Sequence, residues 1–169
     1  MRMMTGLGVL AGLACIGGPA VAAITQQTFA VQLTIQASCV IRSAANLNFG
    51  TLGVLGGVSG TANNDQQSTI AVQCTNTTPF DIGLDAGTTT GGSVATRKLL
   101  STTTSATVNY KLYSESTHTT NWGNTVGTDT VTDTGNGASV NYTVYGRIPP
   151  QTTPAPGAYA DTVTVTVTY

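Results

Sequence analysis

Apolar and polar residues alternate strictly at the C-terminal end of the chain, and this alternation predicts a β-strand. Successive side chains of a strand point to opposite faces, so residues 162–169 have one threonine face and one apolar face. The apolar face consists of Val163, Val165, Val167 and Tyr169. Residues 28–39 alternate in the same way, with an apolar face made by Phe29, Val31, Leu33, Ile35 and Ala37. We expect a strand in each of these two segments.

The middle of the chain predicts further short strands separated by turn-forming residues. Apolar or alternating runs occupy residues 45–53, 68–76, 79–87, 98–101, 106–116 and 140–148. Residues 117–139 are rich in turn formers and predict a long connection with one or two short strands. Residues 149–157 predict a bend, because their prolines lack the N–H that a ladder needs. About seven short strands with turns between them indicate an all-β sandwich.

Composition excludes nucleic-acid binding and indicates one folded domain. Charged residues make up 8% of the 169 residues, and the formal net charge is −1. Nucleic-acid binding needs a basic surface, so we expect no nucleic-acid partner. The hydrophobic fraction of 40% is large enough for a core, and the length suits one domain.

The N-terminus predicts a signal for export. Arg2 precedes a short apolar stretch, and the small residues that signal peptidase requires follow at 20–23. We assign residues 1–22 to a signal peptide, with cleavage after Ala22 or Ala23. An uncleaved membrane anchor is disfavoured by the many glycines, and a lipoprotein site at Cys15 is disfavoured by the residues before it. Cys15 therefore belongs to the removed peptide.

Two cysteines remain in the mature chain, Cys39 and Cys74. An exported protein meets an oxidising compartment, where an even pair predicts one disulfide. The alternative, a reactive thiol or a metal-binding pair, lacks supporting ligands. On the chain-entropy view, a disulfide across a loop of this length stabilises the fold by roughly 4 kcal/mol.

Few residues could support catalysis. His118, the single histidine, lies in a polar loop with Glu115 as the nearest carboxylate, and no nucleophile pattern surrounds it. Asp81 and Asp85 share a face of one expected strand and could form a glycosidase pair. Solubilising charges at a strand and its turn are the simpler interpretation of these two aspartates.

Two loop features suggest binding rather than catalysis. Asp129 and Asp133 could contact Ca²⁺, although no calcium-loop spacing surrounds them. Trp122, together with Tyr113, could stack on a sugar, but a single loop tryptophan is more often a local hydrophobic anchor. The sequence has neither a phosphate-binding glycine loop nor a cluster of metal ligands. We therefore expect no enzyme and no cofactor.

The alternating segment before Cys39 allows two interpretations. Residues 24–37 either form the first strand of their own sandwich or reach another molecule by β-strand addition. In strand addition, main-chain hydrogen bonds supply affinity and alternating side chains fill pockets. Periodicity alone leaves both interpretations open.

Several stretches of the mature chain resemble the spore coat protein U family. They are SCVIRSAANLNFGTLG at 38–53, VQC at 72–74, YKLYS at 110–114, WGNTVGTDT at 122–130 and VNYTVYGRIPPQTTPAPGAYADTVTVTVTY at 140–169. The last stretch is the most specific, and its proline-rich part falls where the family has a variable loop. The family includes the subunits of archaic, Csu-type chaperone–usher pili.

The resemblance implies an immunoglobulin-like sandwich that lacks its last strand, with a domain at 38–169 and a donor arm at 23–37. A periplasmic chaperone would lend a strand to the open groove, and the arm of a neighbouring subunit would replace that strand at the outer-membrane usher. The donated side chains would be Phe29, Val31, Leu33 and Ile35. The groove that receives the strand and contacts the chaperone would be lined by Val163, Val165, Val167 and Tyr169. The disulfide would tie the first strand to the second.

The resulting hypothesis is a structural subunit of an adhesive or biofilm pilus. It would be exported through the periplasm to the cell surface and assembled with copies of itself. One alternative is a secreted spore-coat or matrix protein of the same fold, which would complement itself without a partner. Another alternative is a sugar-binding module that uses Trp122 and Tyr113.

Overall fold

The computed structural model describes residues 18–19, 21–57 and 59–169. The chain divides into two units, Met1–Thr34 and Ile35–Tyr169. Most of the expected signal peptide lies outside the described residues, whereas the expected cleavage residues Ala22 and Ala23 are exposed and have no regular secondary structure. None of the described residues belongs to a helix with the length and hydrophobicity of a transmembrane span.

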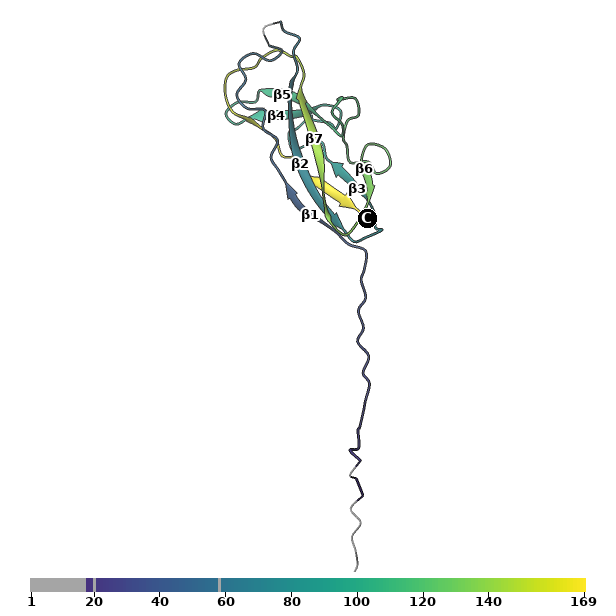
Figure 1. Cartoon of the computed structure of the whole chain (residues 1–169). Helices are drawn as coiled ribbons and strands as arrows, with labels where there is room; N and C mark the ends of the chain where they lie inside the picture. Colours follow the sequence, from purple (N-terminus) through teal and green to yellow (C-terminus); the bar gives the residue numbers. More distant parts are fainter. Residues whose placement is uncertain (1–17, 20, 58) are drawn as a thin grey trace, which may run out of the picture. The chain divides into compact units, whose positions relative to one another are not determined.

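A six-stranded antiparallel sheet forms the larger layer of the second unit (Figure 1). Its spatial order is β1-β2-β7-β5-β4-β8, so strands that are distant in sequence become neighbours. The strands are β1 (Cys39–Ala44), β2 (Asn64–Cys74), β4 (Arg97–Ser101), β5 (Thr107–Tyr113), β7 (Ser139–Ile148) and β8 (Tyr159–Ala160). Strand β1 is at one edge of this sheet.

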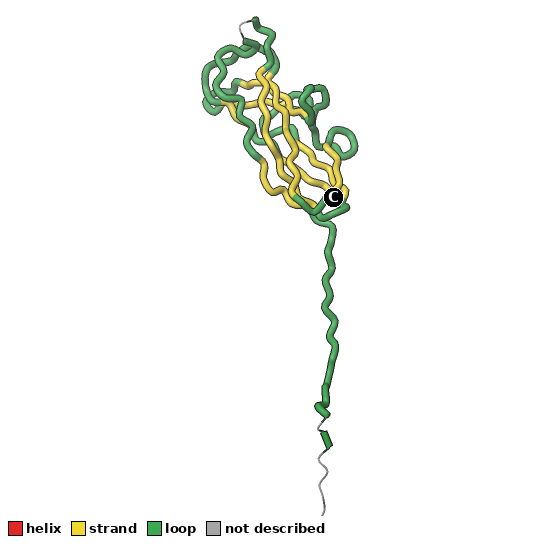
Figure 2. The backbone as a smooth tube through the Cα atoms, in the orientation of Figure 1, coloured by secondary structure: helices red, strands yellow, loops and turns green. Residues whose placement is uncertain are grey.

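A three-stranded antiparallel sheet forms the second layer, in the order β6-β3-β9. Its strands are β3 (Pro79–Leu84), β6 (Val131–Thr134) and β9 (Val165–Thr168). The described residues contain no α-helix (Figure 2). The structure confirms the all-β sandwich that the alternating segments predict, and it makes β9 an edge strand.

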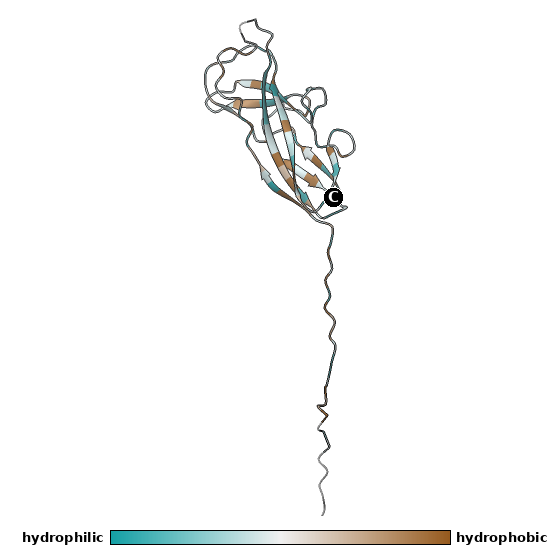
Figure 3. Ribbon diagram, in the orientation of Figure 1, coloured by the Kyte–Doolittle hydropathy of each residue, from teal (hydrophilic) through white to brown (hydrophobic). Residues whose placement is uncertain are grey.

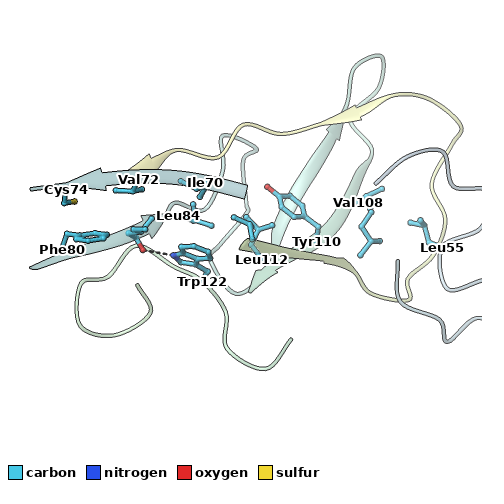
Figure 4. Close-up of a cluster of buried hydrophobic side chains, with 13 residues drawn as sticks. Leu55, Ile70, Val72, Cys74, Phe80, Leu84, Val108, Tyr110, Leu112 and Trp122 are labelled. Atoms are coloured by element: carbon cyan, nitrogen blue, oxygen red, sulfur yellow. Dashed lines mark hydrogen bonds between the residues drawn. The ribbon is translucent and has the colours of Figure 1, made fainter. Parts of the chain in front are cut away.

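The hydrophobic core contains buried residues of both sheets (Figure 4). Ile82 of β3 and Val72 of β2 are 0% and 1% exposed. Trp122, in the connection between β5 and β6, is buried, and its indole Nε1 donates a hydrogen bond of 2.8 Å to the carbonyl of Ile82. This bond anchors the connection to β3 and satisfies the indole N–H in the core. The other core members are Leu55, Ile70, Cys74, Phe80, Leu84, Val108, Tyr110, Leu112, Val144 and Ile148.

Most of the predicted strands are confirmed within a few residues. Strands β2, β3, β4, β5 and β7 fall on five of the six central segments, and β6 lies in the turn-rich connection. Residues 149–157 form no strand, as their prolines predict. Figure 3 shows hydrophobic positions between hydrophilic ones along these strands, which is the pattern that predicts them.

The strand predicted at residues 28–39 is wrong up to residue 38. Residues 28–38 have no regular secondary structure, and the first strand begins at Cys39. Alternation describes the two faces of a segment, but a strand also needs a neighbouring ladder of N–H and C=O groups. Within the described part of the chain, no strand pairs with residues 28–38.

The strand predicted at residues 45–53 is also wrong. The side-chain oxygen of Asn48 accepts the N–H of Gly50 at 2.8 Å, and Gly50 has a φ of 74°. A local side-chain bond of this kind competes with a sheet ladder, and a positive φ ends extended backbone. The segment therefore leaves the sheet after β1.

The predicted disulfide is confirmed. Cys39 and Cys74 lie opposite each other in the β1–β2 register, with 4.0 Å between their Cα atoms. The bond joins the first residue of β1 to the last residue of β2. It therefore ties an edge strand to its neighbour in the sheet.

Candidate functional site

In the part of the chain that the structure describes, strand β9 has a neighbouring strand on one side only. It pairs with β3, and no other strand of the described chain pairs with it. The carbonyl of Thr164 accepts the N–H of Asp85 at 3.1 Å, so these two residues form a hydrogen-bonded pair. Because hydrogen-bonded and non-hydrogen-bonded positions alternate in an antiparallel pair, the main-chain groups of Val165 and Val167 face away from β3. These groups lie on an open edge.

Strand β1 has an open edge as well. Among the described strands it pairs with β2 alone, and the carbonyl of Ser38 accepts the N–H of Thr75 at 2.9 Å. By the same alternation, the main-chain groups of Cys39 and Ile41 face away from β2. The Cα atoms of β1 and β9 approach within 8 Å of each other. The open edges of the two sheets are therefore adjacent.

The inner faces of the two edge strands are incompletely covered. Ile41 lies opposite Val72, so both side chains are on the same face of the sheet. Val72 is 1% exposed, whereas Ile41 is 38% exposed. On β9, Val165 and Val167 pack against the core but are only half-buried. Residues at core positions thus lack the neighbour that would exclude water from them.

A cleft of about 1190 Å³ opens beside these edges. One wall is formed by residues 44–53, and the other by residues 153–163 together with Val165. Core residues line the cleft between these walls, among them Ile70, Val108, Tyr110, Val144 and Ile148. The cleft is therefore continuous with the hydrophobic core.

Only two of the four predicted acceptor residues line the cleft. Val163 and Val165 line the cleft. Val167 packs against the core without lining the cleft, and Tyr169 is 61% exposed. Their role as acceptors stays a prediction, and the geometry favours the first two.

Sequence reasoning missed most of both walls. The wall at 44–53 contains two half-buried apolar residues, Leu47 and Phe49. A signal was available, because these residues stand between asparagines and a glycine that disfavour a regular strand. In the other wall, residues 153–161 were not predicted. They belong to the connection between β7 and β9, which begins with the proline-rich bend and lies beside the core.

Asp161 anchors the wall that leads into β9. Its Oδ1 accepts hydrogen bonds of 3.0 to 3.2 Å from the N–H and hydroxyl groups of Thr88 and Thr89. Its Oδ2 accepts the hydroxyl of Tyr110 at 2.7 Å. Gly87 has a φ of 82°, and a Cβ there would overlap the carboxylate of Asp161. One carboxylate therefore joins the loop after β3, the strand β5 and the entry to β9.

The predicted donor residues are exposed. Residues 21–38 have no regular secondary structure. Phe29, Val31, Leu33 and Ile35 are 76% to 87% exposed. Four large apolar side chains in alternation are rarely left in water unless they bind a partner. Their role as donors stays a prediction.

The sugar-binding interpretation that used Trp122 and Tyr113 is wrong. Both side chains are buried, at 1% and 6% exposure, so neither ring can offer a face to a sugar. His118 is half-buried, and its ring packs edge-on against the rings of Tyr113 at 5.2 Å and Tyr145 at 6.0 Å. This loop is held by aromatic packing.

The two aspartates considered as a glycosidase pair bind groups of their own chain. Asp81 accepts the hydroxyls of Thr130 and Thr132. Burial raises the pKa of Asp85, but hydrogen bonds from the main chain of Thr164 and Gly87 outweigh it, and the pKa lies below its ordinary value. A general acid needs a raised pKa, so Asp85 is unsuited to that role.

The aspartates considered as calcium ligands also accept hydrogen bonds from their own chain. Asp129 accepts the N–H of Thr125 at 2.7 Å, and Asp133 accepts the hydroxyl of Tyr142 at 2.6 Å. Among the described residues, no three His, Cys, Asp or Glu side chains are grouped so that they could hold a metal ion. Within the described residues, the candidate site is therefore the pair of open edges on β1 and β9 with the cleft beside them.

The family model of the Spore Coat Protein U domain matches residues 25–166 of the chain. No curated protein matches the sequence.

A solved structure shares the fold. It is the crystal structure of the CsuC–CsuE chaperone–tip adhesion subunit pre-assembly complex from the archaic chaperone–usher Csu pili of Acinetobacter baumannii. The similarity covers 80% of this chain and 41% of the matched chain, with 21% sequence identity and a TM-score of 0.58. At this identity the likeness shows the fold, an immunoglobulin-like sandwich.

Proposed function

Because this chain belongs to the Spore Coat Protein U domain family, we propose that it is a structural subunit of an extracellular chaperone–usher pilus, assembled by donor-strand complementation. The observation that carries the proposal is the adjacent pair of open edges on β1 and β9. A strand inserted there would pair with the main-chain groups of Val165 and Val167. It would also cover the exposed side chain of Ile41.

The inserted strand would be the N-terminal arm, residues 23–37, of a neighbouring copy. Its apolar residues alternate with the period of a strand, so one face can enter the cleft while main-chain groups pair with β9. Burying each large apolar side chain contributes roughly 1.5 to 3 kcal/mol. Each main-chain hydrogen bond contributes about 1 kcal/mol. Together these contacts can hold a non-covalent polymer.

The arm of the same molecule is a poorer occupant of the cleft. Only residues 36–38 separate Ile35 from β1, so the arm would have to reverse in a hairpin turn. These residues are Gln, Ala and Ser, and they lack the Gly, Asn or Asp that such turns favour. A second copy meets no such constraint. This comparison favours a polymerising subunit over a self-complemented coat or matrix protein.

A chaperone and an usher complete the proposal. An uncovered apolar edge promotes aggregation, so a periplasmic chaperone would supply a temporary strand before assembly. An outer-membrane usher would be the place where the arm of the next subunit replaces it. Residues 1–22 would direct export, residues 38–169 would form the subunit domain, and the fibre would serve adhesion or biofilm formation. The shared fold with a chain of a chaperone–subunit complex supports these partners.

Co-expression tests this function. The chain is produced in the periplasm with and without a periplasmic chaperone of an archaic chaperone–usher pilus. We expect a soluble complex with the chaperone, and aggregated or degraded chain without it. A soluble monomer that unfolds reversibly without any partner would contradict the proposal and would favour the self-complemented coat protein.

A further inference from the structure

Gly146 lies in the interior of β7, on the face that points to the core. Its neighbours on the same face, Val144 and Ile148, are buried and line the cleft. The backbone does not require glycine here, because Gly146 is not among the glycines with positive φ. Glycine in the interior of a strand weakens it, so its presence there points to a close approach by another group.

The approaching groups are Leu47 and Phe49. A Cβ on Gly146 would lie 2.6 and 3.0 Å from the two methyl carbons of Leu47, and 3.1 Å from Phe49 Cζ. Both side chains are half-buried and line the cleft, and the ring of Phe49 packs edge-on against Tyr110 at 6.4 Å. The wall formed by residues 44–53 therefore rests on the bare backbone of Gly146.

We propose that Gly146 is a specificity-determining residue of the cleft, because it sets the size of the apolar side chain that the cleft accepts from an incoming strand. This proposal rests on the proposed function. A side chain at position 146 would push the ends of Leu47 and Phe49 away from the sheet. The space open to them is the cleft. With glycine, the cleft takes a large residue of the incoming arm, Phe29 or Leu33; with alanine, it takes a smaller one.

Peptide exchange on the chaperone-bound subunit tests the proposal. The probes are synthetic peptides of residues 24–38, either unchanged or with one residue replaced by alanine, and the readout is the rate of chaperone release. For Gly146→Ala we expect exchange with the unchanged peptide to be about tenfold slower than in the wild type. We expect this slowing to vanish for the peptide with Phe29→Ala or for the peptide with Leu33→Ala. Peptides with Val31→Ala and Ile35→Ala should keep it.

Two control variants separate a change of cleft size from general damage. Asn141→Ala is the control, because Asn141 lies in the same strand as Gly146, is exposed and does not line the cleft. It should exchange at the wild-type rate. Leu47→Ala added to Gly146→Ala should restore the rate by removing the displaced side chain.

The outcomes are distinct. Equal slowing of Gly146→Ala for every peptide would overturn the proposal, and so would the absence of slowing. If the wild-type subunit releases its chaperone with none of the peptides, the proposed function itself fails, and this proposal fails with it.

Discussion

The hydroxyl of Tyr110 donates a hydrogen bond of 2.7 Å to Asp161 Oδ2 and so joins two residues that line the cleft. We expect Tyr110→Phe to lower the free energy of unfolding of the partner-bound subunit by about 1.5 to 3 kcal/mol, the range for a hydrogen bond to a charged group. Chemical unfolding measures this loss. Tyr159→Phe is the control, because its hydroxyl donates to the carbonyl of Ala155. The control should lose only about 0.5 to 1.5 kcal/mol.

The same hydrogen bond makes the free energy of unfolding depend on pH in the alkaline range. Burial, and then the bond to Asp161, raise the pKa of Tyr110 well above its ordinary value of 10.0. A raised pKa means that this contribution to stability is complete below about pH 10 and is lost as the pH rises further. Tyr110→Phe should therefore lose less stability than the wild type between neutral and strongly alkaline pH. Identical alkaline unfolding of the two proteins would contradict the assignment.

The fold could be predicted from the sequence where a segment finds its partner within the chain. The alternating residues around Val72 and Val144 form β2 and β7, which pair with each other along most of their length. Residues 28–37 alternate just as clearly and form no strand. Periodicity reports which side chains share a face, whereas pairing depends on the neighbour that the segment meets.

The candidate site could be predicted only in part. The valine face of the last segment was recognisable from alternation, and Val163 and Val165 do line the cleft. The wall that contains Leu47 and Phe49 was not, because Asn48 and Gly50 turn the chain out of the sheet. The position of that wall against the sheet depends on Gly146, which is about a hundred residues away in sequence. The local patterns that predict strands do not encode such a contact.

Amide hydrogen exchange can locate the inserted strand on β9. We expect the N–H groups of Val165 and Val167 to be protected in the chaperone-bound subunit, because the inserted strand accepts their hydrogen bonds. The N–H groups of Thr166 and Thr168 face β3 and serve as an internal reference for protection. Rapid exchange at the two valines beside protected threonines would show that nothing pairs with the open edge.

A charge placed on the apolar face of the arm tests its role as donor. Leu33→Asp would bring a carboxylate into the cleft, and burying an unpaired charge is strongly unfavourable. We expect this variant to form the chaperone complex normally and to give no polymer. Gln32→Asp, one residue away on the polar face, should polymerise like the wild type. Polymer from Leu33→Asp in normal amount would reject the assigned face of the arm.

The disulfide should support the edge that receives the strand. Replacing both Cys39 and Cys74 by alanine removes a bond across 35 residues, with an expected loss of roughly 4 kcal/mol on the chain-entropy model. Because β2 is the only neighbour of β1 among the described strands, we expect the loss to appear as release of β1 and a reduced yield of chaperone complex. The yield and the urea midpoint of the complex measure it. Wild-type values for both would show that pairing with β2 alone holds the strand.

Electrophoresis of sheared fibres tests the central claim most directly. Cells that express the chain with its chaperone and usher are sheared, and the released material is run in SDS with and without boiling. Donor-strand polymers predict a ladder at multiples of the subunit mass without boiling and a single band after boiling. A single monomer band in both lanes would contradict the account and would identify a self-contained sandwich.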